Sequence, residues 1–316
     1  MKQLVFLGFL FAFLTIAIAK SFAAEPGPAK QEPAAYVGNE VCKACHPTQF
    51  EKFSQTVMGK IFLFNPRNET ERQACENCHG PGSNHVAAGG GKGVGGLITF
   101  RKDTGESVQL QNETCLTCHQ RGVQTYWNAS PHASRGIGCV NCHTIMEKTS
   151  DRFQLAKVGE HTPFFTKRAQ TEICGQCHLQ RQAQLLRSSH MPLREGKMTC
   201  TDCHNPHGTP NPSQLKQQSV NDNCYTCHTE RRGPFLWEHP PVLESCTNCH
   251  EPHGSVNDRL LKVTDPRLCT QCHLASTSHP VTPRPRTSVF FFNRSCTNCH
   301  SQVHGSNHPG GQFFTR

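Results

Sequence analysis

The sequence is poor in the side chains that build a large apolar core. Hydrophobic residues make up 35% of the 316 positions, with only 3 Tyr and 2 Trp. Chain-breaking residues are frequent instead, with 25 Gly and 21 Pro. A chain of this length ordinarily forms one or two domains around apolar cores. The shortage argues against a large enzyme sheet or barrel and predicts that something other than side chains fills the interior.

No long hydrophobic run occurs after the N-terminus. The one such run covers residues 4–19, follows Lys2 and precedes a group of small residues. A basic start, an apolar stretch of about 7–15 residues and a small-residue site predict a secretory signal peptide, here residues 1–23 with cleavage near Ala23 or Ala24. The alternative, a retained membrane anchor, requires about 20 apolar residues. We therefore expect an exported protein whose mature chain begins with a flexible Pro- and Ala-rich leader at 24–41.

No cysteine lies outside a single motif. All 20 belong to the pattern Cys-x-x-Cys-His, which occurs ten times and is the attachment motif of c-type haem. Its two thiols bind the porphyrin as thioethers, and its histidine ligates the iron. The motifs, numbered 1 to 10 in chain order, are Cys42/Cys45/His46, Cys75/Cys78/His79, Cys115/Cys118/His119, Cys139/Cys142/His143, Cys174/Cys177/His178, Cys200/Cys203/His204, Cys224/Cys227/His228, Cys246/Cys249/His250, Cys269/Cys272/His273 and Cys296/Cys299/His300.

Zinc and disulfides are the competing interpretations of these cysteines. A zinc ribbon uses two Cys pairs per metal and does not require a histidine after each pair. A disulfide framework explains an even number of cysteines but neither the constant spacing nor the histidine. The sequence therefore predicts ten covalently bound haem c groups, with the ten motif histidines as proximal iron ligands.

The histidines outside the motifs are candidates for the second axial bond. A six-coordinate iron has no vacancy for a substrate, which suits electron transfer; the alternative for any single histidine is a solvated surface position. Several share a context, because a second histidine follows the motif histidine within 204–208 and again within 250–254. We predict that most of them ligate neighbouring haems. The candidates are His85, His132, His161, His190, His207, His239, His253, His279, His304 and His308.

The motif spacing indicates an array rather than separate haem pockets. Motifs from Cys200 to Cys296 start 24, 22, 23 and 27 residues apart, and the block at Cys200 recurs at Cys246 with an offset of 46, as expected for duplicated two-haem units. The predicted fold is a multihaem cytochrome c of short α-helices and loops with little β-structure. It would form an elongated haem wire from two pentahaem halves, 42–178 and 200–316, with a connector at 179–199. The glycine-rich stretch 89–96 is interpreted as a flexible connector.

The net charge requires correction for the cofactor. The polypeptide carries +9, which falls to +7 without Lys2 and Lys20. Each ferric haem with two ionised propionates contributes about −1, so ten haems bring the total to about −3. The basic residues therefore compensate propionates, and we expect no nucleic-acid partner.

With these motifs the chain resembles the MtrA/DmsE family of periplasmic decahaem c-type cytochromes, which includes relatives from iron-oxidising bacteria. The likeness covers essentially the whole mature chain. It rests on the segments 75–81 with His85, 198–208, 219–224, 232–239 and 299–309.

The resemblance implies an electron carrier rather than an enzyme. In this family the cytochrome is threaded into an outer-membrane β-barrel porin. There it links periplasmic electron carriers to donors or acceptors outside, as in iron oxidation or metal reduction, with an outer-surface multihaem cytochrome as a further partner. A folded chain crosses a hydrocarbon layer of about 30 Å only inside a protein sheath.

Two methionines stand where the family pattern has histidine. Met58-Gly59 follows motif 1 in place of His-Gly, and Met146 occupies the second histidine position of a Cys-His-x-x-His pattern after motif 4. Thioether ligation raises a haem potential relative to two imidazoles. Met58 and Met146 are therefore candidate distal ligands, and high potentials in the N-terminal half would favour electron flow towards that end. The alternative is that both methionines pack against porphyrin while other histidines, such as His161, ligate the iron.

Two other functions remain open at this stage. A free periplasmic electron shuttle shares the haem content but lacks the barrel. A multihaem reductase of nitrogen or sulfur oxyanions needs an open iron site, often marked by Cys-x-x-Cys-Lys, whereas all ten motifs here end in histidine.

Overall fold

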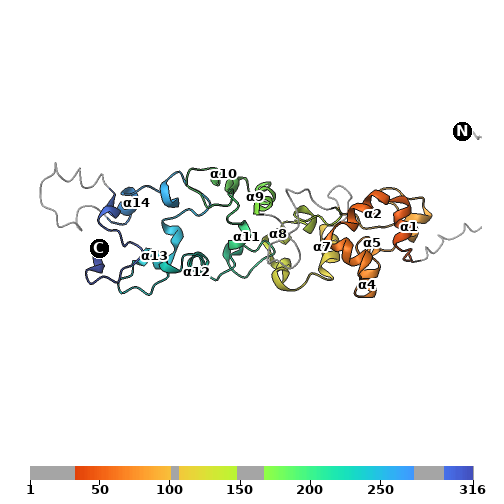
Figure 1. Cartoon of the computed structure of the whole chain (residues 1–316), viewed down its shortest axis with the longest axis horizontal. Coiled ribbons are helices and arrows are strands. Elements are labelled where there is room, and N and C mark those ends of the chain that lie inside the picture. The colour runs from red at the N-terminus through yellow and green to blue at the C-terminus, as the bar shows by residue number, and fades with distance from the viewer. Residues whose placement is uncertain (1–32, 101–106, 148–166, 274–294, 316) are drawn as a thin grey trace, which may run out of the picture. The chain divides into compact units, whose positions relative to one another are not determined.

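The computed structural model describes residues 33–100, 107–147, 167–273 and 295–315 (Figure 1). The described residues from Ala35 onward form one unit. The predicted signal peptide lies outside the described residues. The helices are α1 (Asn39–Cys45), α2 (Pro47–Ser54), α3 (Val57–Gly59), α4 (Glu69–Arg72), α5 (Cys75–His79), α6 (Ser83–Ala87), α7 (Val108–Leu116), α8 (Pro131–Ser134), α9 (Lys167–Gly175), α10 (Leu179–Gln184), α11 (Cys200–Cys203), α12 (Val220–Tyr225), α13 (Pro240–Glu244) and α14 (Arg267–Thr270).

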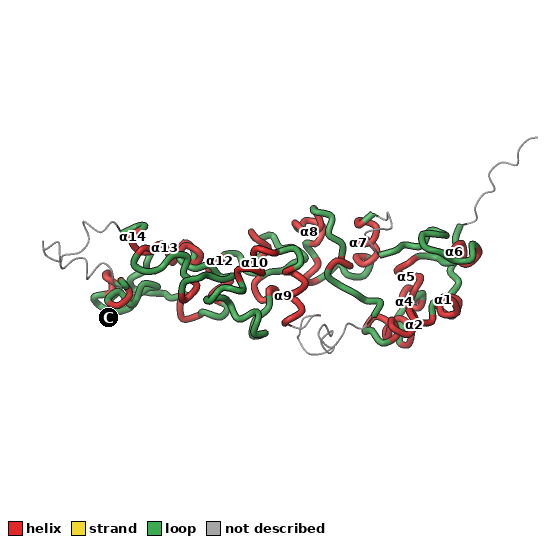
Figure 2. Tube along the Cα trace, turned by 90° about the horizontal axis from the view of Figure 1, so that it is seen from above, coloured by secondary structure: helices red, strands yellow, loops and turns green. Residues whose placement is uncertain are grey.

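Short helices and loops make up the described chain, as the sequence predicts. Figure 2 shows helices joined by long loops and no strand in the described ranges. Isolated β-bridges occur instead, for example between Trp237 and Ser306. The breakers explain the short helices: α5 ends at Gly80 with φ +86°, and α13 begins with proline. None of these helices combines the length and apolar composition needed to cross a bilayer.

Side chains contribute little apolar volume to the interior. In the described residues, the buried hydrophobic side chains are Phe53, Phe62, Ala74, Trp127 and Leu185. A larger group of buried side chains is polar or charged, including Gln111, Asn112, Gln170 and Asn221. Most buried residues in an ordinary globular domain are aliphatic or aromatic. The cohesion of residues 35–316 therefore depends on something other than a packed aliphatic core.

The 46-residue offset seen in the sequence is also a repeat of conformation. His204 bridges to Leu215, and His250 bridges in the same way to Leu261. The turn between each pair has two consecutive residues at positive φ, Ser213 and Gln214 in the first copy (54° and 56°) and the corresponding 259–260 in the second (58° and 60°). The two blocks thus present their motifs and the histidines after them in the same local geometry.

Candidate haem sites

Each attachment motif folds as one helical turn. In nine motifs the backbone N–H of the histidine donates to the carbonyl of the first cysteine, at 2.8–3.0 Å, and motif 2 forms helix α5. This turn brings the two thiols, three residues apart, to the same side of the chain. None of the twenty cysteines forms a disulfide. Both thiols of every motif are therefore available to one porphyrin.

The first cysteines join the motifs in pairs. The first thiol of motif 1 lies beside that of motif 2, close enough to affect its pKa, and the same proximity recurs for motifs 3 and 4, 5 and 6, 7 and 8, and 9 and 10. The pairs are Cys42 with Cys75, Cys115 with Cys139, Cys174 with Cys200, Cys224 with Cys246, and Cys269 with Cys296. Burial and the neighbouring thiol raise the pKa of Cys75 to about 11. These sulfur atoms are thus close together and partly shielded from water.

The second cysteines connect one pair of motifs to the next. The thiols of motifs 2 and 3 interact electrostatically, as do those of motifs 4 and 5, 6 and 7, and 8 and 9. The residues are Cys78 with Cys118, Cys142 with Cys177, Cys203 with Cys227, and Cys249 with Cys272. Together the two sets of contacts place every motif beside the motif before it and the motif after it. The ten motifs therefore follow one another in space in the order of the sequence.

The second cysteines of the two terminal motifs differ from the other eight in their thiol neighbours, although not in exposure, since most second cysteines are exposed. Cys45 of motif 1 and Cys299 of motif 10 are exposed, and in the part of the chain that the structure describes neither thiol contacts a thiol of another motif. The series of motifs ends at these two positions, so there is no further motif for them to adjoin. Cys299 is still held within its own motif, because its backbone N–H donates to the carbonyl of Cys296 at 3.1 Å. The thioether role of Cys45 and Cys299 therefore rests on the motif itself and stays a prediction.

A side-chain oxygen fixes each pair of motifs. It lies three or four residues before the odd-numbered motif and accepts a hydrogen bond from a backbone N–H at the start of the even-numbered motif. These inter-motif acceptors are Asn39 to Cys75 (3.2 Å), Asn112 to Cys139 (2.9 Å), Gln170 to Thr201 (3.1 Å), Asn221 to Cys246 (2.7 Å) and Asp265 to Cys296 (3.0 Å). The Gln170 contact crosses the predicted connector 179–199, so motifs 5 and 6 are joined like the other pairs. The division into two halves stays a prediction.

Six motif histidines face a histidine from outside the motifs. The ring centres lie 6.0–6.3 Å apart, and five of the six pairs have planes within 13–23° of parallel, the sixth being edge-on at 78°. The pairs are His46 with His85, His143 with His207, His178 with His132, His204 with His253, His250 with His304, and His273 with His239.

This spacing fits a haem iron between the two rings. An iron–imidazole bond is about 2 Å long and the ring centre lies about 1 Å behind the bonding nitrogen, so two imidazoles on opposite sides of one iron have centres about 6 Å apart. Direct stacking of two rings would bring them closer. The separation found in all six pairs is thus the one that axial ligation requires.

Hydrogen bonds orient many of these rings for ligation through Nε2. The Nδ1 atoms of four motif histidines and four candidate distal histidines lie 2.5–3.0 Å from a backbone carbonyl oxygen. They are His79, His204, His250, His300, His85, His132, His190 and His239. Because a carbonyl can only accept, Nδ1 carries the proton and Nε2 keeps its lone pair, except at His190, where Nε2 faces a carboxylate oxygen of Glu195 and is protonated too. Burial lowers the pKa of His143 and of His304 to about 4, which keeps these rings neutral at neutral pH.

The glycine-rich stretch 89–96 has a structural role that sequence reasoning missed. The carbonyl of Val94 accepts from Nδ1 of His85 at 2.9 Å, and Gly95 lies against the backbone of the same histidine. A Cβ on Gly95 would come within 2.3 Å of the His85 nitrogen. The interpretation as a flexible connector is therefore wrong for this part of the stretch, which positions a candidate iron ligand. The run of glycines close to a candidate histidine in the sequence was the signal that could have indicated this role.

The other candidate ligands are not all brought to a motif histidine. His190 places Nε2 at 3.0 Å from a carboxylate oxygen of Glu195, and His308 accepts from the N–H of Gly310. Met58 is partly buried against the Phe53–Phe62 cluster, and Met146 is exposed. His161 and His279 lie outside the described residues.

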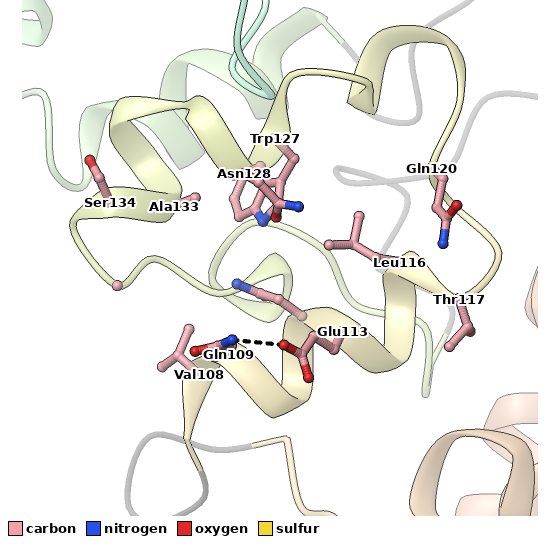
Figure 3. Close-up of a pocket in the computed structure, with 12 residues that line it drawn as sticks. Val108, Gln109, Glu113, Leu116, Thr117, Gln120, Trp127, Asn128, Ala133 and Ser134 are labelled. Atoms are coloured by element: carbon pink, nitrogen blue, oxygen red, sulfur yellow. Dashed lines mark hydrogen bonds between the residues drawn. The ribbon is translucent and has the colours of Figure 1, made fainter.

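A cavity of about 600 Å³ adjoins motif 3. It lies between α7, which carries Cys115, and the segment from Trp127 to Gly136, which carries His132 (Figure 3). One wall of the cavity contains Leu116 and the hydrogen-bonded pair Gln109–Glu113 (2.8 Å). Trp127 lines the opposite wall and also contacts the ring of His207. None of the lining residues is a predicted iron ligand.

Comparison with known proteins supports the same chemistry. The family model described as "Doubled CXXCH motif" matches residues 190–233 and 239–277, and that of "Cytochrome c-type protein NrfB-like" matches residues 75–158. The protein "Multiheme cytochrome MtrA" of Shewanella baltica (strain OS185) is 42% identical over 293 residues, covering 88% of this chain and 81% of its own length.

Proposed function

Because this chain belongs to the MtrA family of multihaem c-type cytochromes, we propose that it carries electrons across an outer membrane inside a β-barrel partner. The family prediction made from the sequence is confirmed, and the chain binds haem c covalently and acts as an electron carrier rather than an enzyme. On the proposed route it accepts or delivers electrons through periplasmic carriers at one end and through an extracellular donor or acceptor at the other. An outer-surface multihaem cytochrome is a further proposed partner, and the apolar segment 4–19 is proposed to direct export.

The observation that carries the proposal is the sequential contact of the ten motifs. Haem c supplies a one-electron couple that changes little in coordination between its ferric and ferrous states when both axial positions are filled. The chain holds consecutive motifs together by thiol contacts and by the inter-motif acceptors. A linear arrangement of this kind supports transfer from one end of the chain to the other, which a catalyst acting at one site would not need.

Ten haems, with mostly paired histidine ligands, are proposed on the same geometry. The six histidine pairs supply two nitrogen ligands each. A seventh pair follows from the repeat: His239 lies ahead of motif 8 and faces His273 of motif 9, and His190 lies ahead of motif 6 in the same way. We therefore propose that His190 pairs with His228 of motif 7, which requires its Nε2 to exchange the carboxylate of Glu195 for iron.

Reconstitution in vesicles tests the conduit. The cytochrome would be co-expressed with the barrel protein of its own genome and inserted into liposomes that contain a reduced viologen dye. A soluble ferric chelate added outside should oxidise the enclosed dye rapidly with both proteins present, and negligibly with either one alone. Equal rates with the barrel alone would contradict the proposal. Failure of the two proteins to co-purify would favour a free periplasmic shuttle, and turnover of nitrite would favour a reductase.

Gly95→Ala should displace His85 from the iron at motif 1. The new Cβ would overlap the His85 backbone, and a side chain at φ +82° costs about 1–2 kcal/mol in addition. We expect one haem to become high-spin, measured by electron paramagnetic resonance of the oxidised protein. Gly93→Ala is the matched control, because Gly93 also has positive φ but open space around its Cβ position. Two indistinguishable spectra would refute the role given to Gly95.

Asp265 should lower the potentials at motifs 9 and 10, because it is the one charged inter-motif acceptor. Partial burial raises its pKa, but hydrogen bonds from Ser295, Cys296 and Thr297 outweigh this and bring the pKa well below the usual range, so the carboxyl is ionised at neutral pH. A unit charge at roughly 10 Å contributes about 1–2 kcal/mol at an effective dielectric of about 20, or several tens of millivolts before solvent screening.

Reciprocal variants measure this effect by spectropotentiometry. Asp265→Asn should raise one pair of midpoint potentials, and Asn221→Asp, the same position for motifs 7 and 8, should lower another. Shifts of the same sign in both variants would show that the charge is not responsible.

A further inference from the structure

The histidine pairs of the even-numbered motifs follow one rule. The motif histidine of one even-numbered motif faces a histidine that belongs to the next even-numbered motif. That facing histidine lies three or four residues after the next motif's own histidine. His207 after motif 6 faces His143 of motif 4, and His253 after motif 8 faces His204 of motif 6. His304 after motif 10 faces His250 of motif 8 in the same way. Motifs 4, 6 and 8 therefore each take their partner from the unit that follows.

The odd-numbered motifs follow a second rule. The motif histidine of an odd-numbered motif faces a histidine from earlier in the chain. That histidine lies just ahead of the even-numbered motif that precedes the odd one. His132, ahead of motif 4, faces His178 of motif 5, and His239, ahead of motif 8, faces His273 of motif 9. Motif 1 has no even motif before it, and its His46 faces His85 instead.

The same rules lead to methionine at motifs 2 and 3. The position three residues after the motif histidine of motif 4 is Met146, which the first rule assigns to His79 of motif 2. The segment 47–74 ahead of motif 2 contains no histidine, and Met58 is its only thioether. The second rule therefore assigns Met58 to His119 of motif 3. Neither His79 nor His119 faces a second histidine ring within the described residues, unlike the six paired motif histidines.

The structure fixes Met58 beside the junction of these motifs. Met58 packs on the cluster of Phe53, Phe62 and Ala74 together with Cys78 of motif 2, and the thiol of Cys78 interacts with Cys118 of motif 3. The backbone around Met58 is held by Thr56. The Thr56 hydroxyl accepts a hydrogen bond at 2.9 Å from the N–H of Gly59, which follows Met58. A Cβ on Gly59 would lie 1.8 Å from the carbonyl oxygen of Phe53. The helical turn that carries Met58 thus has little freedom to move.

An ion pair of the residue after Met146 holds this part of the chain near the N-terminal helices. Glu147 forms an ion pair with Lys52 of α2, with 2.9 Å between the charged atoms. Helix α2 directly follows motif 1, and α1, which carries motif 1, packs against α5, which is motif 2. The chain beyond motif 4 therefore comes back to the region of motifs 1 and 2, where the first rule requires a ligand.

We infer that Met58 and Met146 are the axial iron ligands opposite His119 and His79. The inference rests on the proposed attachment of a haem at each of the ten motifs. Thioether sulfur is a weaker donor to ferric iron than imidazole, so the two sites have the highest potentials in the chain. Motifs 2 and 3 are consecutive, and the chain therefore contains an adjacent pair of high-potential centres near its N-terminal end.

The test uses the full holoprotein after its haem content has been measured as ten per chain. The ferric protein should show the charge-transfer band of a thioether–iron bond. Met58→His and Met146→His should each remove about half of that band, because each replaces one of two thioethers by the imidazole used elsewhere. The double variant should lose all of it, together with the two highest one-electron components in a potentiometric titration. Met198→Leu, a methionine outside both rules, should leave the band and the titration unchanged.

The outcomes separate this inference from the proposed function. A haem content well below ten would contradict the proposed attachment of a haem at every motif, and with it the proposed function. Ten haems with no thioether band in the native protein, or with an undiminished band in the double variant, would refute the methionine assignment alone. His161→Gln should leave the low-spin content unchanged; appearance of a high-spin haem in that variant would give the ligand position to His161 instead.

Discussion

Preventing haem attachment should leave the mature polypeptide unfolded. The described chain buries only five hydrophobic side chains, and many of the groups that accompany them are polar. Ordering the backbone of each residue costs about 1–2 kcal/mol, which burial of so few apolar groups does not offset. We therefore expect the folded state to depend on the porphyrins as apolar surface and on the proposed axial bonds that join distant parts of the chain.

The comparison is between the chain produced in the cytoplasm without residues 1–23, where haem is not attached, and the holoprotein matured in the periplasm. We expect the haem-free chain to lack a cooperative thermal transition and to be digested by a protease at every loop. The holoprotein should show one transition and resist the same treatment. A haem-free chain with a cooperative transition and native-like circular dichroism would disprove the claim that side chains alone cannot form this interior.

His253→Met should slow end-to-end transfer by about a hundredfold. His253 faces His204 of motif 6, in the middle of the array, and a thioether there raises the local potential relative to its neighbours. A one-electron site made deeper by about 120 mV releases its electron about a hundred times more slowly, because about 59 mV corresponds to a factor of ten. The thiol contacts of motifs 5 to 8 join consecutive motifs, so we expect the main route of transfer to pass through motif 6.

The measurement is the rate of dye oxidation in the vesicle assay, with haem content and low-spin signal as checks on integrity. His85→Met is the matched control, because it makes the same chemical change at motif 1, beside the two sites already assigned thioether ligands. It should alter the rate far less. Equal slowing in both variants would mean that the position of the altered site is immaterial, which a linear array does not allow.

The chemistry of this protein was predictable from sequence because attachment is local. The spacing within each Cys-x-x-Cys-His motif determines one helical turn, so thiols and proximal histidine are specified without reference to the rest of the fold. The pairing of the candidate distal histidines with motif histidines was not predictable, because His207 and His143 come together only when two units dock. The shared sequence context of His207 and His253 showed that both act alike, but not which motif each one faces.

Other features were missed for identifiable reasons. Asn39, Asn112 and Asn221 are common polar residues, and their placement three positions before an odd-numbered motif has meaning only once the even-numbered motif is known to lie beside it. The contact of Gly95 with His85 depends on a tertiary close approach, whereas composition alone predicted mobility.

The order in which ligands are supplied has a consequence for biosynthesis. The chain is made N-terminus first, yet His143, His204 and His250 each face a ring from a unit that follows their own in the sequence. On the proposed ligand pairing, the iron centres of motifs 4, 6 and 8 are therefore only half-coordinated until the next unit has emerged and docked. A nascent or prematurely terminated chain would present a reactive five-coordinate iron at its growing end, and protection of that site must come from whatever accompanies the chain during maturation.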